Sequence, residues 1–213
     1  MKILILGATG SIGRYLVPQA LEQGHELTAL VRHPGKLQSD PRMRIVQGDA
    51  LDSAAVNRAI AGQDAVIYSL GTRHLGKTTL FSDSTRILIA AMKQHSVRRL
   101  VAITGIGAGD SKGHGWWFYD WIFYPLITKR MYDDKDRQEE IIRASGLDWI
   151  IVRPAVFTNG PRRDQLRAES DLRDVTIRFI SRADTAAFVL EQLTSDRWLH
   201  KTPLVGYYSM FHK

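Results

Sequence analysis

Short apolar runs alternate with amphipathic stretches along the first three quarters of the chain. Most of the runs are continuously apolar rather than alternating, which is typical of strands buried on both faces of a parallel sheet. The stretch from Thr78 to His95 is the clearest predicted helix, because its apolar residues fall at helical spacing. Strands that alternate with helices predict a doubly wound, mostly parallel α/β sheet. The predicted strands are Lys2–Leu6, Leu27–Val31, Arg44–Gln47, Ala65–Tyr68, Leu100–Ile103 and Trp149–Val152.

The pattern weakens after about residue 154. Residues Pro161–Asp174 are polar and arginine-rich, and they predict a long loop. Ser181-Arg182-Ala183-Asp184 resembles a capping box and predicts a helix that runs to about Leu193. Pro203–Tyr208 is the predicted last strand.

Composition bounds the class of protein. The 213 residues are 44% apolar and 24% charged, without repeats or a linker, so we expect one domain over residues 1–213. Within it, residues 1–156 form the predicted cofactor half, and residues 105–130 and 154–213 the predicted substrate or lid elements. The absence of cysteine excludes disulfides and a cysteine nucleophile, and the seven histidines lack the paired spacing of metal ligands.

Net charge and hydropathy indicate which ligands and which cell compartment we expect. The net charge of +7 is spread over scattered arginines and lysines, which favours a basic surface and a phosphate ligand over nucleic acid. The short apolar stretch before the glycine loop does not fit a signal peptide, and no apolar run in the sequence reaches about 18 residues, so we expect a cytoplasmic protein.

A glycine-rich loop, Gly7-Ala8-Thr9-Gly10-Ser11-Ile12-Gly13, follows the first strand and opens an amphipathic stretch. Glycines in this context let the chain turn tightly and let its backbone approach a pyrophosphate, while the helix amino terminus offers N–H groups to the anion. The loop predicts a Rossmann-type dinucleotide site; the alternative is a glycine-rich turn without a ligand.

The end of the second strand predicts which dinucleotide is preferred. NAD-binding proteins place an acidic residue there for the ribose 2′-hydroxyl, whereas NADP-binding proteins accommodate a 2′-phosphate with arginine. This chain has Arg32 and Lys36 and no acid. NADP(H) is therefore the predicted cofactor rather than NAD(H); the alternative is a turn that is basic by chance.

Together these motifs resemble the atypical short-chain dehydrogenase/reductases, in the NmrA-like NAD(P)H-binding group, and among them the biliverdin-IXβ/flavin reductases. The resemblance covers about residues 1–156. It is carried by Gly7–Gly13, Val31-Arg32, Gly48-Asp49, Gly62–Ile67, Leu70–Arg73, Ala90–Lys93, Ser145–Asp148 and Arg153-Pro154.

The resemblance implies roles for further residues at predicted strand ends. Asp49 would bond the adenine amino group with Ala50 beside the ring, although Asp49 could instead cap the helix predicted at Ser53–Ile60. The nicotinamide ribose and pyrophosphate would be lined by Leu70, Gly71, Thr72 and Arg73, and the nicotinamide would contact Pro154, Ala155 and Val156.

The chain departs from the pattern of most short-chain dehydrogenases at the catalytic pair. Those enzymes carry a tyrosine four residues before a lysine, whereas Met131 stands four residues before Lys135 here. Tyr132 is one position away from the usual place, so it is either a proton donor or a packing residue. Lys135 is expected to bond the nicotinamide ribose. Thr104, followed by Gly105, stands where many relatives have serine.

Hydride transfer to a planar acceptor needs little side-chain acid–base catalysis. The sequence therefore favours an NADPH-dependent reductase of a flavin-, quinone- or tetrapyrrole-like acceptor. The alternative is a non-catalytic NADP(H)-binding redox sensor of the NmrA-like type.

An aromatic segment, Trp116–Tyr124, contains seven aromatic residues among nine. Three interpretations remain open: a segment that covers the core or forms a homodimer, a wall for a small planar apolar substrate, or a peripheral membrane contact.

Overall fold

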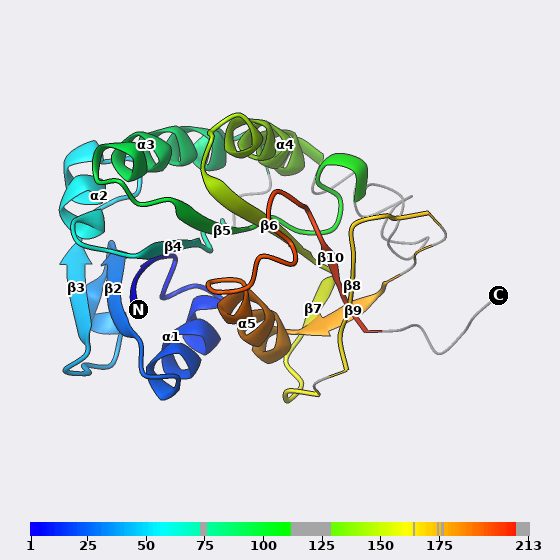
Figure 1. Ribbon diagram of the computed structural model, residues 1–213, viewed down its shortest axis with the longest axis horizontal. Coiled ribbons are helices and arrows are strands. Elements are labelled where there is room, and N and C mark those ends of the chain that lie inside the picture. Colours follow the sequence, from blue (N-terminus) through cyan, green and yellow to red (C-terminus); the bar gives the residue numbers. More distant parts are fainter. Residues whose placement is uncertain (73–75, 112–128, 164, 174, 176, 208–213) are drawn as a thin grey trace.

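The computed structural model describes residues 1–72, 76–111, 129–163, 165–173, 175 and 177–207, which form layered α/β architecture (Figure 1). The helices are α1 (Gly13–Glu22), α2 (Ser53–Ile60), α3 (Leu80–Gln94), α4 (Lys129–Arg143) and α5 (Arg182–Glu191). The strands are β1 (Lys2–Leu6), β2 (Glu26–Val31), β3 (Met43–Gln47), β4 (Ala65–Tyr68), β5 (Arg99–Ile103), β6 (Asp148–Pro154), β7 (Val156–Thr158), β8 (Arg167–Glu169), β9 (Phe179–Ser181) and β10 (Leu204–Gly206).

The main sheet has the strand order β3-β2-β1-β4-β5-β6-β10-β8. Its strands are parallel except β8, which pairs antiparallel with β10, and β7 and β9 form a separate parallel pair. The predicted doubly wound sheet is confirmed. The order reverses between β1 and β4, and a crevice for ligands opens at the carboxyl ends of the strands at such a point.

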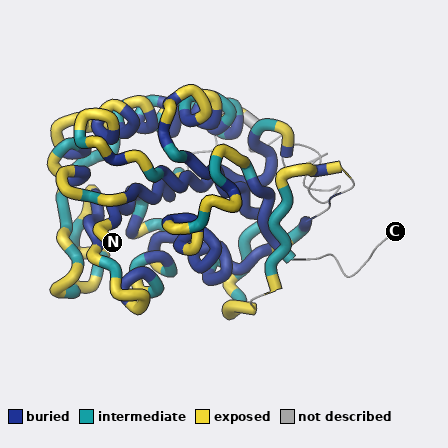
Figure 2. The backbone as a smooth tube through the Cα atoms, viewed as in Figure 1, coloured by how far each residue is buried: buried dark blue, intermediate teal, exposed yellow. Residues whose placement is uncertain are grey.

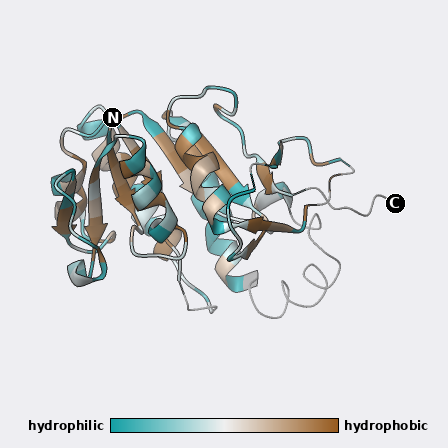
Figure 3. Cartoon of the chain, turned by 90° about the horizontal axis from the view of Figure 1, so that it is seen from below, coloured by the Kyte–Doolittle hydropathy of each residue, from teal (hydrophilic) through white to brown (hydrophobic). Residues whose placement is uncertain are grey.

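Two apolar cores lie on opposite faces of the sheet. Helices α2, α3 and α4 cover one face, and α1 and α5 cover the other (Figure 1). In β1, Ile3 and Ile5 join the α1/α5 core, while Leu4 and Leu6 join the other. Because neighbouring residues of a strand point to opposite faces, a continuously apolar strand fills both cores. The central strands are accordingly buried (Figure 2), and they are hydrophobic behind α1 and α5 (Figure 3).

The carboxyl-terminal part contains three short strands that the sequence did not predict, β7, β8 and β9. Within the predicted loop Pro161–Asp174, Arg167–Glu169 forms the edge strand β8. Its polar residues gave no apolar signal, since an edge strand has neighbours on one side only. The predicted helix start is confirmed, because the Ser181 hydroxyl caps α5 by accepting a hydrogen bond from the Asp184 backbone N–H at 3.0 Å. The Ser181 N–H, which a full capping box would pair with the Asp184 carboxylate, donates to the Tyr207 hydroxyl at 3.0 Å. None of the described helices combines the length and hydropathy needed to cross a membrane.

Candidate functional site

The glycine loop joins β1 to α1 at the point where the strand order reverses. Gly7 has φ +90°, and a Cβ there would lie 2.3 Å from the carbonyl oxygen of Ser69 at the end of β4. A Cβ on Gly13 would lie 2.2 Å from the Gly7 carbonyl oxygen. Any side chain at these two positions would therefore collide with backbone. Gly10 is less confined, because its Cβ would lie 3.0 Å from the same oxygen.

The amino terminus of α1 is open to a ligand. Its cap residue, Ile12, has no side chain that can accept a hydrogen bond, and the first turn of α1 contains no acidic residue. The first N–H groups of a helix carry a partial positive charge and favour an anion. Thr9 and Ser11 are exposed beside this terminus. Both the uncapped helix and the glycine cradle therefore fit the pyrophosphate of a dinucleotide.

Arg32 and Lys36 follow β2 at the same edge of the sheet. Both residues are exposed. Within the described part of the chain, neither side chain takes part in a hydrogen bond or an ion pair. Two uncommitted cations next to the glycine loop fit a 2′-phosphate on the adenosine ribose.

The predicted adenine contact, Asp49, follows β3. One of its carboxylate oxygens accepts the Leu51 backbone N–H at 2.9 Å, and the residue is half-buried. The capping interpretation of Asp49 is wrong, because the carboxylate of Asp52 caps α2 by accepting the N–H of Ala54 at 2.9 Å. A side chain must precede the first helical residue directly to reach these N–H groups, and Asp49 stands three residues too early.

The other predicted cofactor residues lie at the carboxyl ends of adjacent strands. Ala50 follows β3, Leu70, Gly71 and Thr72 follow β4, and Pro154, Ala155 and Val156 end β6 and begin β7. Arg73 and the aromatic segment Trp116–Tyr124 lie outside the described residues.

Helix α4 brings Lys135 and Tyr132 to the end of β5. The Lys135 ammonium donates a hydrogen bond to the Thr104 carbonyl oxygen at 2.6 Å. The Tyr132 hydroxyl lies against Gly105, where an added Cβ would be 2.8 Å away from it. Both side chains are buried, and the Lys135 Nζ is 5.9 Å from the centre of the Tyr132 ring. Despite their spacing of three residues, the two groups therefore reach the same segment.

The profile of the family described as NAD(P)H-binding matches residues 7–196 of this chain, which is most of its length. The chain belongs to this NAD(P)H-binding family. The match begins at the first glycine of the loop and extends through β6 and α5, so it contains every element of the site described above.

Three known proteins illustrate the relationship. The photosystem II assembly factor Ycf39 of Synechocystis sp. is 25% identical over 219 residues; the alignment covers 97% of this chain but only 63% of Ycf39. A short-chain dehydrogenase/reductase from Veillonella parvula, solved in complex with NADP, superposes with a TM-score of 0.82 at 15% identity and covers 99% of this chain and 96% of its own. ChuY from Escherichia coli O157:H7, described as an anaerobillin reductase, gives 0.80 at 20% identity and full coverage of both chains.

These likenesses confirm the Rossmann-type fold, and the family match confirms the predicted resemblance to an NAD(P)H-binding group. At such low identities the two solved structures show the fold alone. The chain also spans less than two thirds of Ycf39, so nothing about that whole protein's role transfers directly.

Beneath the candidate cofactor site lies a buried ionic network that the sequence did not predict. Glu139 and Arg153 are fully buried, and the Arg153 guanidinium donates to the two Glu139 carboxylate oxygens at 3.0 and 2.6 Å. The Thr104 hydroxyl donates to the same carboxylate at 2.8 Å. Two signals were present in the sequence: an arginine at the end of an apolar strand, and a glutamate one helical turn after Lys135.

Burial lowers the pKa of Lys135 to about 8, although the carboxylates of Glu139 and Asp134 act in the opposite direction. Desolvation disfavours the charged ammonium, and it outweighs the two nearby negative charges. A substantial fraction of Lys135 is therefore neutral just above physiological pH, and this fraction responds to neighbouring charges.

Replacing Lys135 with methionine is expected to stabilise the folded protein at neutral pH. The depressed pKa means that the folded state binds the proton less well than the unfolded state, which costs up to about 3 kcal/mol below pH 8. The cost disappears as the pH rises from about 8 towards 10.5, so wild type and Lys135→Met should converge there. Urea denaturation at several pH values measures this difference. A gap that stays constant with pH would contradict it.

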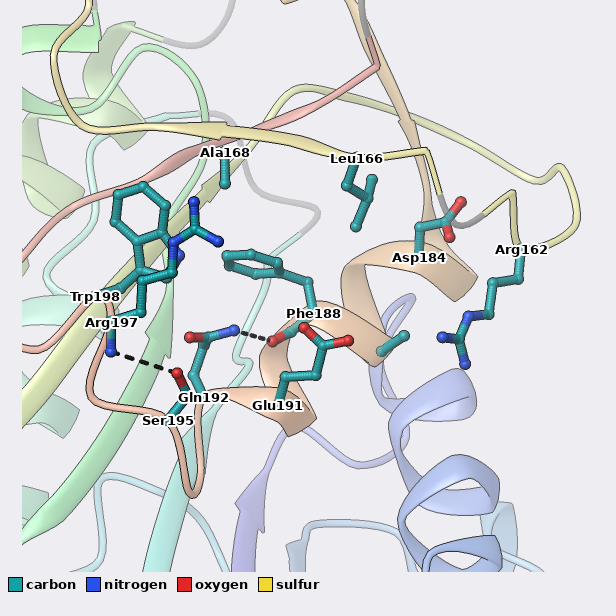
Figure 4. A pocket seen from close by; sticks show the side chains of 11 residues that line it. Arg162, Leu166, Ala168, Asp184, Phe188, Glu191, Gln192, Ser195, Arg197 and Trp198 are labelled. Atoms are coloured by element: carbon teal, nitrogen blue, oxygen red, sulfur yellow. Dashed lines mark hydrogen bonds between the residues drawn. The ribbon is translucent and has the colours of Figure 1, made fainter.

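Two hollows lie on the described surface outside the glycine loop. One, of about 380 Å³, lies between α5 and β8 and is lined by the aromatic side chains of Phe188 and Trp198 and the charged side chains of Glu191 and Arg197, among others (Figure 4). It contains none of the predicted site residues. The other, of about 580 Å³, is lined by Asp110, Leu172 and Arg173 among others. Asp110 belongs to the short helix Gly109–Ser111 after β5, so this hollow adjoins the buried network.

Proposed function

We propose that this chain is an NADPH-dependent reductase of a planar acceptor, such as a flavin-, quinone- or tetrapyrrole-like compound. The observation that carries the proposal is the convergence of Lys135 and Tyr132 on the Thr104–Gly105 segment, at the edge of the sheet that also presents the glycine loop. A bound NADPH supplies a hydride. The protein supplies position: the α1 amino terminus for the pyrophosphate, and the Lys135 ammonium for the nicotinamide ribose.

The family and two solved neighbours support this proposal. ChuY is described as a reductase, and the V. parvula protein was solved with NADP. We propose a planar acceptor because of the sequence. Met131 stands four residues before Lys135, where most short-chain dehydrogenases have a tyrosine. This replacement argues against alcohol or ketone chemistry, which needs a proton donor in that place, and leaves hydride transfer between planar rings.

Arg32→Ala is expected to weaken NADPH binding much more than NADH binding. The loss of a charge-assisted bond to the 2′-phosphate corresponds to about 1.5–3 kcal/mol, or roughly 10- to 100-fold in Kd. Fluorescence titration with both cofactors measures it. Arg86→Ala, which removes an exposed arginine on α3, is the matched control. Equal losses for NADPH and NADH would refute the assignment of Arg32.

Tyr132→Phe is expected to reduce turnover by less than about tenfold, because a general acid typically contributes 10²- to 10⁴-fold and none is needed here. Stopped-flow measurement of NADPH oxidation with the acceptor in excess tests this. A larger loss with unchanged NADPH affinity would identify Tyr132 as a proton donor that has moved by one position together with Lys135.

A redox sensor is the second candidate, and the replaced tyrosine at position 131 also favours it. Steady-state oxidation of NADPH in the presence of flavin mononucleotide, menadione or biliverdin separates the two functions. A reductase consumes NADPH over many turnovers with at least one of them. Tight NADPH binding without turnover, whichever planar acceptor is added, would favour the sensor.

A further inference from the structure

Helix α4 holds residue Thr104 from two sides. The Lys135 ammonium donates to the Thr104 carbonyl oxygen at 2.6 Å, and the Glu139 carboxylate accepts from the Thr104 hydroxyl at 2.8 Å. Lys135 and Glu139 are one helical turn apart and therefore share a face of α4. The Thr104 backbone N–H donates to the Val152 carbonyl oxygen at 3.0 Å. The residue that receives the ammonium is thus fixed at its N–H, its hydroxyl and its carbonyl.

Glu139 is fixed in turn by Arg153 on β6. The guanidinium donates from Nε to one carboxylate oxygen and from Nη2 to the other, which is the planar two-bond geometry that makes arginine–carboxylate pairs specific. The third nitrogen, Nη1, is paired with the carboxylate of Asp110. Asp110 lies in the segment that follows Thr104, and it is a wall of the 580 Å³ hollow. Arg153 therefore connects this hollow, through Glu139, to Thr104, whose carbonyl oxygen accepts the Lys135 hydrogen bond.

We propose that Glu139 and Arg153 are positioning residues of the cofactor site: they fix Thr104, and through it they set the place and the charge of the Lys135 ammonium. The proposal rests on the proposed reductase function for the use of that ammonium, but not for its electrostatics. An ion pair with a purely structural role would affect the stability of the fold, and its shortening in a folded variant would leave kcat unchanged.

The surroundings of Lys135 allow the charge of Glu139 to influence the protonation of the Lys135 ammonium. From α4 it faces the carboxylates of Asp134 and Glu139 and the ring of Tyr132. The Thr104 carbonyl faces it from the end of β5, and the Phe81 ring of α3 lies 4.8 Å from its Nζ. In such a dry site a nearby carboxylate favours the ammonium form, and its loss disfavours that form.

The first arm of the test follows Lys135 directly in the cofactor-free protein. The Cε signals of ¹³C-labelled lysines are titrated by NMR, and Lys135→Arg identifies the signal. Glu139→Gln keeps the shape of the side chain and removes its charge, so the pKa of Lys135 should fall by about 1. Arg143→Met is the matched control. The side chain of Arg143 is half-exposed, and it donates at 3.0 Å to the Glu139 oxygen that Arg153 Nη2 also contacts. It should leave the titration close to that of wild type.

The second arm separates charge from placement. Glu139→Asp keeps the charge but is one methylene too short to hold Thr104 and Arg153 together. It should leave the pKa of Lys135 near its wild-type value, yet lower kcat by about 10- to 100-fold with little change in the KM for NADPH, as expected when a binding group is misplaced. Wild-type kcat in Glu139→Asp would overturn the positioning role.

Asp110→Asn keeps the test decisive if Glu139→Gln does not fold. The Asp110 side chain is 66% exposed, so its replacement should be tolerated, and it removes the second carboxylate that holds Arg153. It should lower kcat in the same way as Glu139→Asp but less, while the pKa of Lys135 stays near its wild-type value, because water screens an exposed carboxylate. An unchanged Lys135 titration in folded Glu139→Gln, an equal change in Arg143→Met, or wild-type kcat in both Glu139→Asp and Asp110→Asn would overturn the proposal. If wild type turns over no acceptor, the proposed reductase function fails, while the titration still decides the role of Glu139 and Arg153.

Discussion

Arg153→Met is expected to lower the free energy of unfolding by about 3–5 kcal/mol, the range for removing one partner of a buried ion pair. Arg153 is completely buried, and its guanidinium donates to both oxygens of Glu139, whose side chain is also completely buried. Methionine has a similar length but provides no donor. The Glu139 carboxylate would then be left with the Thr104 hydroxyl and the half-exposed Arg143.

Guanidinium denaturation followed by circular dichroism measures the loss. Arg143→Met again serves as the control and should cost less than about 1 kcal/mol, because partly exposed ion pairs contribute little. The double variant Glu139→Met/Arg153→Met should recover much of the loss, since two apolar side chains leave no buried charge. If the double variant is less stable than Arg153→Met alone, the loss does not come from an unpaired Glu139.

The local pattern of apolar and polar residues predicted many of the strands and the position of the glycine loop. Strands buried on both faces are visible as apolar runs, and β1 and β4 begin and end as predicted. The glycine loop was recognised because its function depends on consecutive residues: a turn, a close backbone approach and a helix start. Arg32 and Lys36 were predicted as phosphate ligands from their distance to that loop, which the fold fixes.

What the sequence could not predict depends on contacts between distant residues. Glu139 and Arg153 meet only because α4 packs against the end of β6, and no periodicity reports that pairing. Strand β8 exists because Ala168 pairs with Val205 of β10, and its own residues are polar or small. The capping alternative for Asp49 failed for a different reason: Asp52 stands directly before the predicted helix start at Ser53, and this spacing alone favours it as the cap.

The glycine loop gives the sharpest contrast between binding and folding. Gly10→Val is expected to leave a folded protein that loses NADPH affinity by about 100-fold or more, because the branched side chain would fill the space that the pyrophosphate needs. Its Cβ would lie 3.0 Å from the Gly7 carbonyl oxygen, so a shift of a few tenths of an ångström accommodates it within the fold.

Gly13→Val should instead damage the fold itself. Its Cβ would lie 2.2 Å from the Gly7 carbonyl oxygen and 2.4 Å from that of Ala8, and backbone atoms inside a packed layer cannot move away. The loss of stability should exceed about 4 kcal/mol, the size that marks a broken core or strained backbone. Gly160→Val is the control for both variants, because its Cβ would meet nothing closer than 3.9 Å.

Thermal melting and NADPH titration of the three variants together test this division. Gly10→Val should melt near the wild-type temperature and bind poorly, Gly13→Val should melt far lower, and Gly160→Val should match wild type in both measurements. Normal NADPH binding by folded Gly10→Val would mean that the pyrophosphate does not lie on this loop. A stable Gly13→Val would mean that α1 does not pack against its own loop as closely as the structure has it, and the open helix terminus would then lose its place in the cofactor site.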